Sequence, residues 1–264
     1  MSFETKRMLV TVKAYPIVSK FHGAAVCTAG ITEDGEWIRL FPVPFPLPRE
    51  KNYKKYDWIE FKAKKAREWR KESYDLDRDG WKTIKIIDSL AVSDVRKETA
   101  IENWKKRKKI VLSNLSKSIE ELEVKKEKDG TSLGVIKPKE VEDFFWVKSD
   151  KCTKWEKDLL NNTQRTLYGE YRRPVEKIPW VFRYKFFCDD SQCKGHNIMC
   201  EDWELIQCYR AWKPKYGENT LEKIKEKYFD DFFDGKRDTY FYMGTDFRWG
   251  KFLIVGLFYP PKGI

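Results

Sequence analysis

A run of thirteen residues, Cys188 to Cys200, contains three of the six cysteines of the chain and one of its two histidines. The spacing is Cys-x4-Cys-x2-His-x3-Cys. Zinc is held by four soft or borderline ligands in a tetrahedron, and this run can supply all four without a distant segment. Gly195 allows a sharp turn between the second and the third. The run therefore predicts a structural zinc site at Cys188, Cys193, His196 and Cys200.

Two alternatives stay open for this run. In the first, three of the four residues bind the metal, and Asp202 or a distant residue completes the shell. In the second, Cys193 and His196 bind nothing, and Cys200 packs against Trp203. Three candidate thiolates favour a structural ion over a catalytic one, which would leave a position for water.

The order Cys, Cys, His, Cys in residues 188–200 resembles that of a zinc knuckle, a short nucleic-acid-binding module. The intervals between the ligands differ from those of the knuckle. The resemblance covers this run alone, and it implies a zinc-stabilised loop in a protein that contacts nucleic acid.

The charge of the chain points to the same class of partner. Its 53 Lys and Arg against 42 Asp and Glu give a net charge of +11. Such an excess favours polyanions, because neutralised phosphates release their counterions. The alternative is a lysine-rich surface that serves solubility. We therefore expect a DNA-binding or RNA-binding protein, in nucleic-acid processing or defence.

Cationic residues lie beside aromatic ones in several places. Residues 57–64 alternate as in a β-strand, which puts a tryptophan and two lysines on one face, where they can stack a base and bind its phosphates. A solvated amphipathic strand is the alternative. Five consecutive cations follow in a predicted helix, and two arginines lie in a predicted loop. The predicted contacts are Trp58, Lys62, Lys64, Lys105, Lys106, Arg107, Lys108, Lys109, Arg172 and Arg173.

Two further functions remain open. The sequence has no P-loop, dinucleotide fingerprint, nucleophile elbow or His-Glu-x-x-His motif. A metal-dependent nuclease needs only acidic residues and a lysine, and Asp57, Glu60 and Lys62 form such a set. A protein-interaction scaffold could instead use the proline-rich stretch 42–48, whose apolar residues also suit packing across a barrel mouth.

The periodicity predicts an α+β fold: a small N-terminal β-barrel-like domain at 1–92, a helical segment at 93–130, and a mixed α/β part with the zinc-knuckle-like loop at 131–264. Period-two alternation and turn signals predict the strands, and helical spacing predicts the helices. Strands are expected at 7–15, 24–31, 36–41, 57–64, 81–87, 180–187, 239–243 and 251–259. Helices are expected within 93–130, at 140–145, at 155–162, after Asp202 and at 220–233.

The sequence also bears on the compartment. No apolar run approaches the length that spans a bilayer, and the N-terminus lacks the apolar core of a secretory signal. We expect a cytoplasmic protein with reduced thiols and without a membrane partner.

Overall fold

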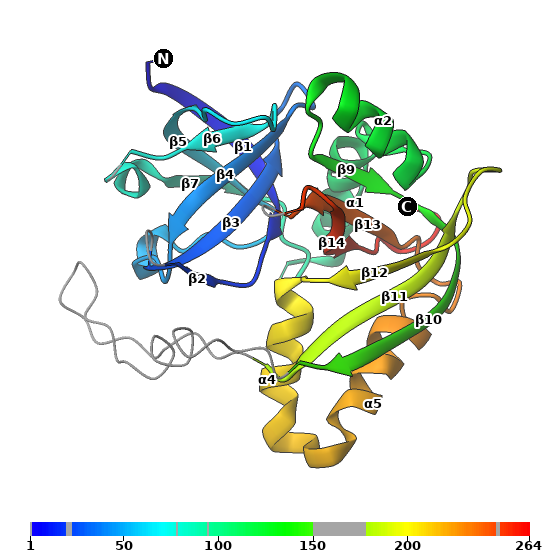
Figure 1. Ribbon diagram of the computed structural model, residues 1–264. Coiled ribbons are helices and arrows are strands. Elements are labelled where there is room, and N and C mark those ends of the chain that lie inside the picture. The colour runs from blue at the N-terminus through cyan, green and yellow to red at the C-terminus, as the bar shows by residue number, and fades with distance from the viewer. Residues whose placement is uncertain (1, 20–22, 78, 94, 150–177, 247–248) are drawn as a thin grey trace.

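The first half of the chain forms a closed β-barrel. The computed structural model describes residues 2–19, 23–77, 79–93, 95–149, 178–246 and 249–264. Five strands follow the order β1-β3-β4-β6-β5, and β5 also pairs with β1, which closes the barrel (Figure 1). Two shorter strands extend it, β2 beside β3 and β7 beside β5. The strands are β1 (Glu4–Lys13), β2 (Ile17–Ser19), β3 (Gly23–Ile31), β4 (Trp37–Pro44), β5 (Asp57–Lys65), β6 (Ser73–Asp75) and β7 (Lys85–Ser89).

The alternation in the sequence explains the barrel core. In β5, Ile59, Phe61 and Ala63 are buried, while the residues between them face outward. In the proline-rich stretch, Val43 is buried, and Phe45 and Leu47 pack against the same core. This placement fits the packing interpretation of that stretch. The strand expected at 81–87 begins later, because residues Gly80–Thr83 form a 3-10 turn.

The second half forms a seven-stranded sheet in the order β10-β11-β12-β14-β13-β9-β8. Most neighbours are antiparallel, but β12 pairs with β14 and β8 with β9 in parallel. The strands are β8 (Leu115–Ser116), β9 (Leu133–Ile136), β10 (Pro138–Lys148), β11 (Trp180–Cys188), β12 (His196–Cys200), β13 (Tyr240–Thr245) and β14 (Phe252–Phe258).

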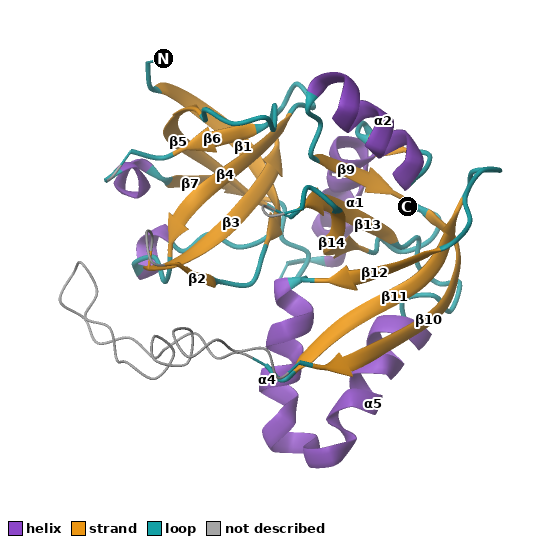
Figure 2. Ribbon diagram, in the orientation of Figure 1, coloured by secondary structure: helices purple, strands orange, loops and turns teal. Residues whose placement is uncertain are grey.

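Helices cover this sheet and the seam between the two halves, as Figure 2 shows. Leu205, Ile224 and Phe232 belong to the same buried core as the aromatic residues of β11 and β13. A helix follows Asp202, as expected, and Asp202 caps it because its carboxylate accepts from the backbone N–H groups of Glu204 and Leu205. The helices are α1 (Lys97–Leu112), α2 (Ile119–Asp129), α4 (Trp203–Tyr216) and α5 (Thr220–Lys225), with a π-helical turn at Glu226–Asp230.

These elements confirm the predicted α+β class, and one predicted helix is wrong. Residues 140–145 lie in β10, which pairs along its length with β11. Phe144 stacks on Phe182 with ring centroids 5.7 Å apart and lies 4.7 Å from the ring of Tyr184. This pairing with a remote aromatic strand overrides the local pattern. The helix expected at 155–162 lies outside the described residues.

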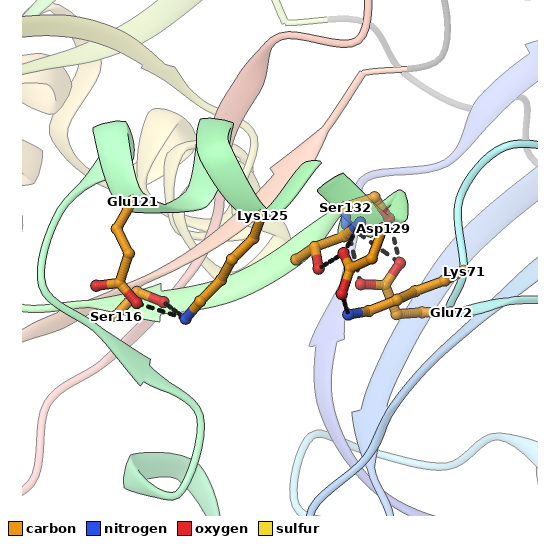
Figure 3. A network of polar contacts seen from close by, with 8 residues as sticks. Lys71, Glu72, Ser116, Glu121, Lys125, Asp129 and Ser132 are labelled. Atoms are coloured by element: carbon orange, nitrogen blue, oxygen red, sulfur yellow. Dashed lines mark hydrogen bonds and ion pairs between the residues drawn. The ribbon is translucent and has the colours of Figure 1, made fainter. Parts of the chain in front are cut away.

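Polar contacts join the barrel to the second half (Figure 3). The carboxylate of Glu72 accepts from the backbone N–H of Ser132 at 2.9 Å and from its hydroxyl at 2.8 Å. The buried Arg39 guanidinium donates to the Ser132 carbonyl at 3.0 Å. Lys71 pairs with Asp129 at the end of α2. The two halves are therefore joined by a buried polar group of Arg39, Glu72 and Ser132 and by an exposed ion pair between Lys71 and Asp129.

Candidate metal centre

Four potential ligands meet between the β11–β12 connection and the start of α2. Cys188 is the last residue of β11, His196 is the first of β12, and Cys193 lies in the loop between them. Glu120 is the second residue of α2. One ligand atom from each of the four lies within 4.8 Å of the others.

The contacts within this cluster are short. The sulfur of Cys193 lies 3.3 Å from Nε2 of His196, and the same nitrogen lies 3.3 Å from Oε1 of Glu120. The backbone N–H of Cys188 donates to the Cys193 sulfur at 3.2 Å. The second carboxylate oxygen of Glu120 is buried and has no hydrogen-bond partner among the residues that the structure describes. A buried acceptor in that state is costly unless something else binds it.

Local structure fixes the loop against the helix. The hydroxyl of Ser118 caps α2 by accepting from the N–H of Glu121, and it donates to the carboxylate of Asp190 at 3.0 Å. The carbonyl of Asp190 accepts from the N–H of Cys193 at 3.1 Å. Gly195 has a φ of +87°, and an added Cβ would lie 3.0 Å from the ring of Phe187. The helix cap and the glycine turn therefore set the ligand positions.

The thiol of Cys188 is held in its neutral form. Burial raises its pKa to about 12, and a hydrogen bond from the backbone N–H of Ile119 at the start of α2 acts in the opposite direction. A bound cation would stabilise the thiolate and take the place of the proton. Metal binding at this position should therefore release a proton.

The ligand set suits a tetrahedral ion. Zinc binds sulfur, imidazole nitrogen and carboxylate oxygen at distances of about 2.0–2.3 Å, which places neighbouring ligand atoms about 3.3–3.8 Å apart. The two distances of 3.3 Å already lie at the lower end of that range. Two thiols, one imidazole and one carboxylate are thus compatible with a metal site.

The structure brings together three of the four predicted ligands, Cys188, Cys193 and His196. The fourth, Cys200, lies outside the cluster. Cys200 lies at the other end of β12 from His196, so their Cα atoms are about 13 Å apart at the rise of an extended strand. It is buried between Phe182 on β11 and Ile254 on β14. Glu120 occupies the fourth position, which matches the alternative of a distant residue completing the shell. The capping pattern from Ser118 to Glu121 locates the start of this helix in the sequence, but not its neighbours.

The predicted nucleic-acid face of β5 has the expected register. Trp58, Lys62 and Lys64 lie on the outer side, and Lys62 is exposed. Trp58 also packs against a buried cluster, and the Lys64 ammonium lies 5.1 Å from the ring of Phe3. Two of the three side chains are thus partly engaged within the protein.

The five consecutive cations of α1 divide into three groups. The Arg107 guanidinium is buried, donates to the Leu90 carbonyl at 2.7 Å and lies 3.7 Å from the ring of Tyr56. Its predicted surface role is wrong, because helical spacing turns it toward the core. The neighbours Lys106 and Lys108 pair with Glu102 and Asp238. Lys105 and Lys109 are exposed and have no ion-pair partner in the described part of the chain. Arg172 and Arg173 lie outside the described residues.

The nuclease set is not brought to one place. Asp57 faces the inner side of β5, where its carboxylate accepts from the N–H of Lys54 at 2.7 Å and the hydroxyl of Ser89 at 2.6 Å. Glu60 faces outward and pairs with Arg7. Residues three apart on a strand point to opposite faces. Asp57 and Glu60 therefore cannot bind one ion together, and Lys62 lies on the face of Glu60 alone.

The molecule is thus a β-barrel protein with a second α/β part that contains a candidate metal centre. Residues 115–263 match the family described as "Domain of unknown function (DUF8757)", and residues 4–113 match "Domain of unknown function (DUF8758)". The first match covers more than half of the chain, which therefore belongs to the DUF8757 family. A comparison with curated proteins finds no match.

The two matches meet between α1 and β8. All four candidate ligands lie in the DUF8757 region. Among the described residues, no helix is both long and apolar enough to cross a membrane.

Proposed function

We propose that this protein binds nucleic acid and that a structural zinc ion at Glu120, Cys188, Cys193 and His196 fixes its second half. The observation that carries the proposal is the meeting of these four ligand atoms within 4.8 Å in a chain with a net charge of +11. The ion would join the start of α2 to the β11–β12 loop. It would have a structural role, because four protein ligands leave no position for a reacting water.

The choice of zinc rests on the donor set and on its surroundings. Two sulfurs and an imidazole select against magnesium and calcium, which prefer oxygen ligands. The unpartnered oxygen of Glu120 supports a ligand role for that carboxylate. The likeness to a zinc knuckle is limited to the order Cys188, Cys193, His196, since the fourth ligand comes from another element.

The nucleic-acid part of the proposal is supported by charge. Lys62, Lys105 and Lys109 are exposed, and lysines free of ion pairs can neutralise phosphates without first losing a partner. The binding would depend mainly on the phosphate backbone, so its affinity should fall steeply as salt is raised.

The metal half is tested by the metal content of the protein purified without added metal, and by substitution with Co²⁺. One zinc per chain is expected, and Co²⁺ should give the ligand-field bands of a tetrahedral site. Glu120→Gln should weaken the site. Cys200→Ala is the matched control and should leave the content and the spectrum unchanged. A protein without bound metal, or one that loses it with Cys200→Ala, would contradict this ligand set.

The nucleic-acid half is tested by titrating labelled single-stranded RNA, single-stranded DNA and duplex DNA at several salt concentrations. The double variant Lys105→Glu, Lys109→Glu should weaken binding across sequences and lower the salt slope by about 1 to 2. Lys213→Glu with Lys215→Glu changes the net charge equally at the exposed end of α4 and should have a smaller effect. Absent or salt-insensitive binding would remove this half of the proposal.

A further inference from the structure

A pocket of about 500 Å³ lies between the barrel and the second half, away from the metal centre. One side is formed by the end of β1, the residues after β4 and the loop before β5. The other side is formed by the start of α4 and by β14. Its size falls within the range of small-molecule sites, which often lie where two domains meet. Neither family region alone contains it.

Lys13 is a largely buried cation of this pocket, and it forms no ion pair with the residues that the structure describes. Its ammonium lies 4.7 Å from the ring of Tyr53 and 4.9 Å from the ring of Trp203. It donates to the Tyr53 carbonyl at 3.1 Å. No carboxylate of the described residues lies within ion-pair distance of it. An ammonium has three N–H donors, so two remain for a ligand.

The two carboxylates of the pocket share one cationic partner within the protein. Lys55 lies 3.1 Å from the carboxylate of Glu204 and 3.9 Å from that of Asp202. The two oxygens of Asp202 also accept from the N–H groups of Glu204 and Leu257. These carboxylates therefore leave Lys13 available to an anion. In total, four cationic side chains and two carboxylates line the pocket, namely Lys13, Lys54, Lys55, Arg210, Asp202 and Glu204.

The remaining lining is apolar. Val12, Phe45, Pro46, Trp203 and Val255 contribute to the wall. Phe45 and Trp203 meet edge to face at 5.3 Å, which gives this side a fixed aromatic surface. A ligand must therefore combine an apolar or flat body with an anionic group.

We propose that this pocket binds a nucleoside phosphate, with the phosphate at Lys13 and the base against the aromatic wall of Phe45 and Trp203. The excess of two positive charges in the lining matches a phosphate monoester, which carries about −1.5 to −2 at neutral pH. Its source is either a free mononucleotide or the phosphorylated end of a strand. The site does not depend on nucleic-acid binding by the outer surface.

Calorimetric titration of the 264-residue chain with the four nucleoside monophosphates tests this site. The nucleosides and ribose 5-phosphate serve as controls that each carry only part of the ligand. We expect a mononucleotide to bind more tightly than either half. Lys13→Met should weaken that binding about 10- to 100-fold, the value of hydrogen bonds to a charged group. Lys13→Arg should retain most of it. Lys128→Met removes an exposed lysine on α2 and should change nothing.

A 5′-phosphorylated oligonucleotide and a circular single strand distinguish the two sources. Binding of the phosphorylated end but not of mononucleotides assigns the site to strand termini. The circular strand has no end, so Lys13→Met should not affect its binding, whereas Lys105→Glu with Lys109→Glu should weaken it. Failure of the outer surface is thus separable from failure of the pocket.

The inference is overturned if none of these phosphates binds at millimolar concentration, or if Lys13→Met binds them as the unchanged protein does. Lys13 is a buried cation without an ion pair, so its replacement should leave no carboxylate unpaired, and a folded Lys13→Met is expected. Trp203→Leu provides a second variant, and a mononucleotide affinity unaltered by it would contradict the place of the base.

Discussion

The metal centre and the pocket between the two halves are built in opposite ways. Three of the four candidate ligands lie within residues 188–196, at the two ends of one loop and within it. The pocket takes its residues from β1, from two barrel loops, from α4 and from β14. A site made by one loop can be recognised in the sequence from the spacing of its residues. A site made by packing two halves together has no such spacing, because its residues are far apart in the sequence.

The two sites also differ in how burial acts on their charges. At the metal centre, burial keeps the Cys188 thiol neutral. In the pocket, burial lowers the pKa of Lys13 to about 8. Burial acts in the same direction on Lys55, but the charges of Glu204 and Asp202 outweigh it and raise that pKa well above its usual value. Lys55 is therefore paired with carboxylates of the protein, whereas an added anion would stabilise the charged form of Lys13.

The largest change in the free energy of unfolding is expected from replacement of Lys55, the paired lysine of the pocket. Lys55→Met leaves the buried carboxylate of Asp202 without its cation, which should destabilise the protein by about 3–5 kcal/mol. Urea unfolding at neutral pH measures this change. Lys128→Met, on an exposed turn of α2, should stay within about 0.5 kcal/mol. Equal stabilities for the two variants would mean that Lys55 does not join the halves.

Zinc should have a comparable effect through the metal centre. At a free concentration about a thousand times the dissociation constant, a bound ion stabilises the folded state by about 4 kcal/mol. Thermal unfolding with and without zinc should show this gain for the unchanged protein and for Cys200→Ala. Cys193→Ser should abolish it. A gain that survives Cys193→Ser would place the ion elsewhere.

Lys13 should give a smaller effect with a defined pH dependence. Its folded-state pKa of about 8 lies below the usual 10.5, so the folded state resists protonation and stability is lower below pH 8. Lys13→Met should therefore be more stable at pH 7 by up to about 3 kcal/mol. The difference should shrink as pH rises from 8 toward 10.5. Urea unfolding of both proteins across this range measures it, and a less stable variant at pH 7 would contradict the cause given.

The smallest effect is expected at the turn of the metal loop. Gly195→Ala should cost about 1–2 kcal/mol from the positive φ alone. The contact with Phe187 adds to this cost and should weaken zinc affinity. Gly235→Ala is the matched control, since Gly235 has a φ of +83° but open space around its Cβ position. Similar losses in the two variants would mean that Phe187 moves aside.

Particular residues show where prediction from the sequence succeeded. The alternation in β5 placed Trp58, Lys62 and Lys64 together on the outer face, and the helix expected after Asp202 is α4. These patterns depend on neighbours a few residues away. The helix expected at 140–145 was wrong because Phe144 packs on β11, and Arg107 was misplaced because its helix turns it toward Tyr56.

The sequence by itself determined the strand periodicity of the barrel and the loop that carries Cys188, Cys193 and His196. Only the tertiary structure decided that Glu120 joins them, that Cys200 does not, and that the Lys13 ammonium lies over the ring of Trp203 in the wall of a pocket. The physical reason is the distance along the chain over which each interaction acts. Backbone periodicity and turn geometry act over a few residues, whereas the burial of two apolar surfaces against each other sets which remote side chains meet.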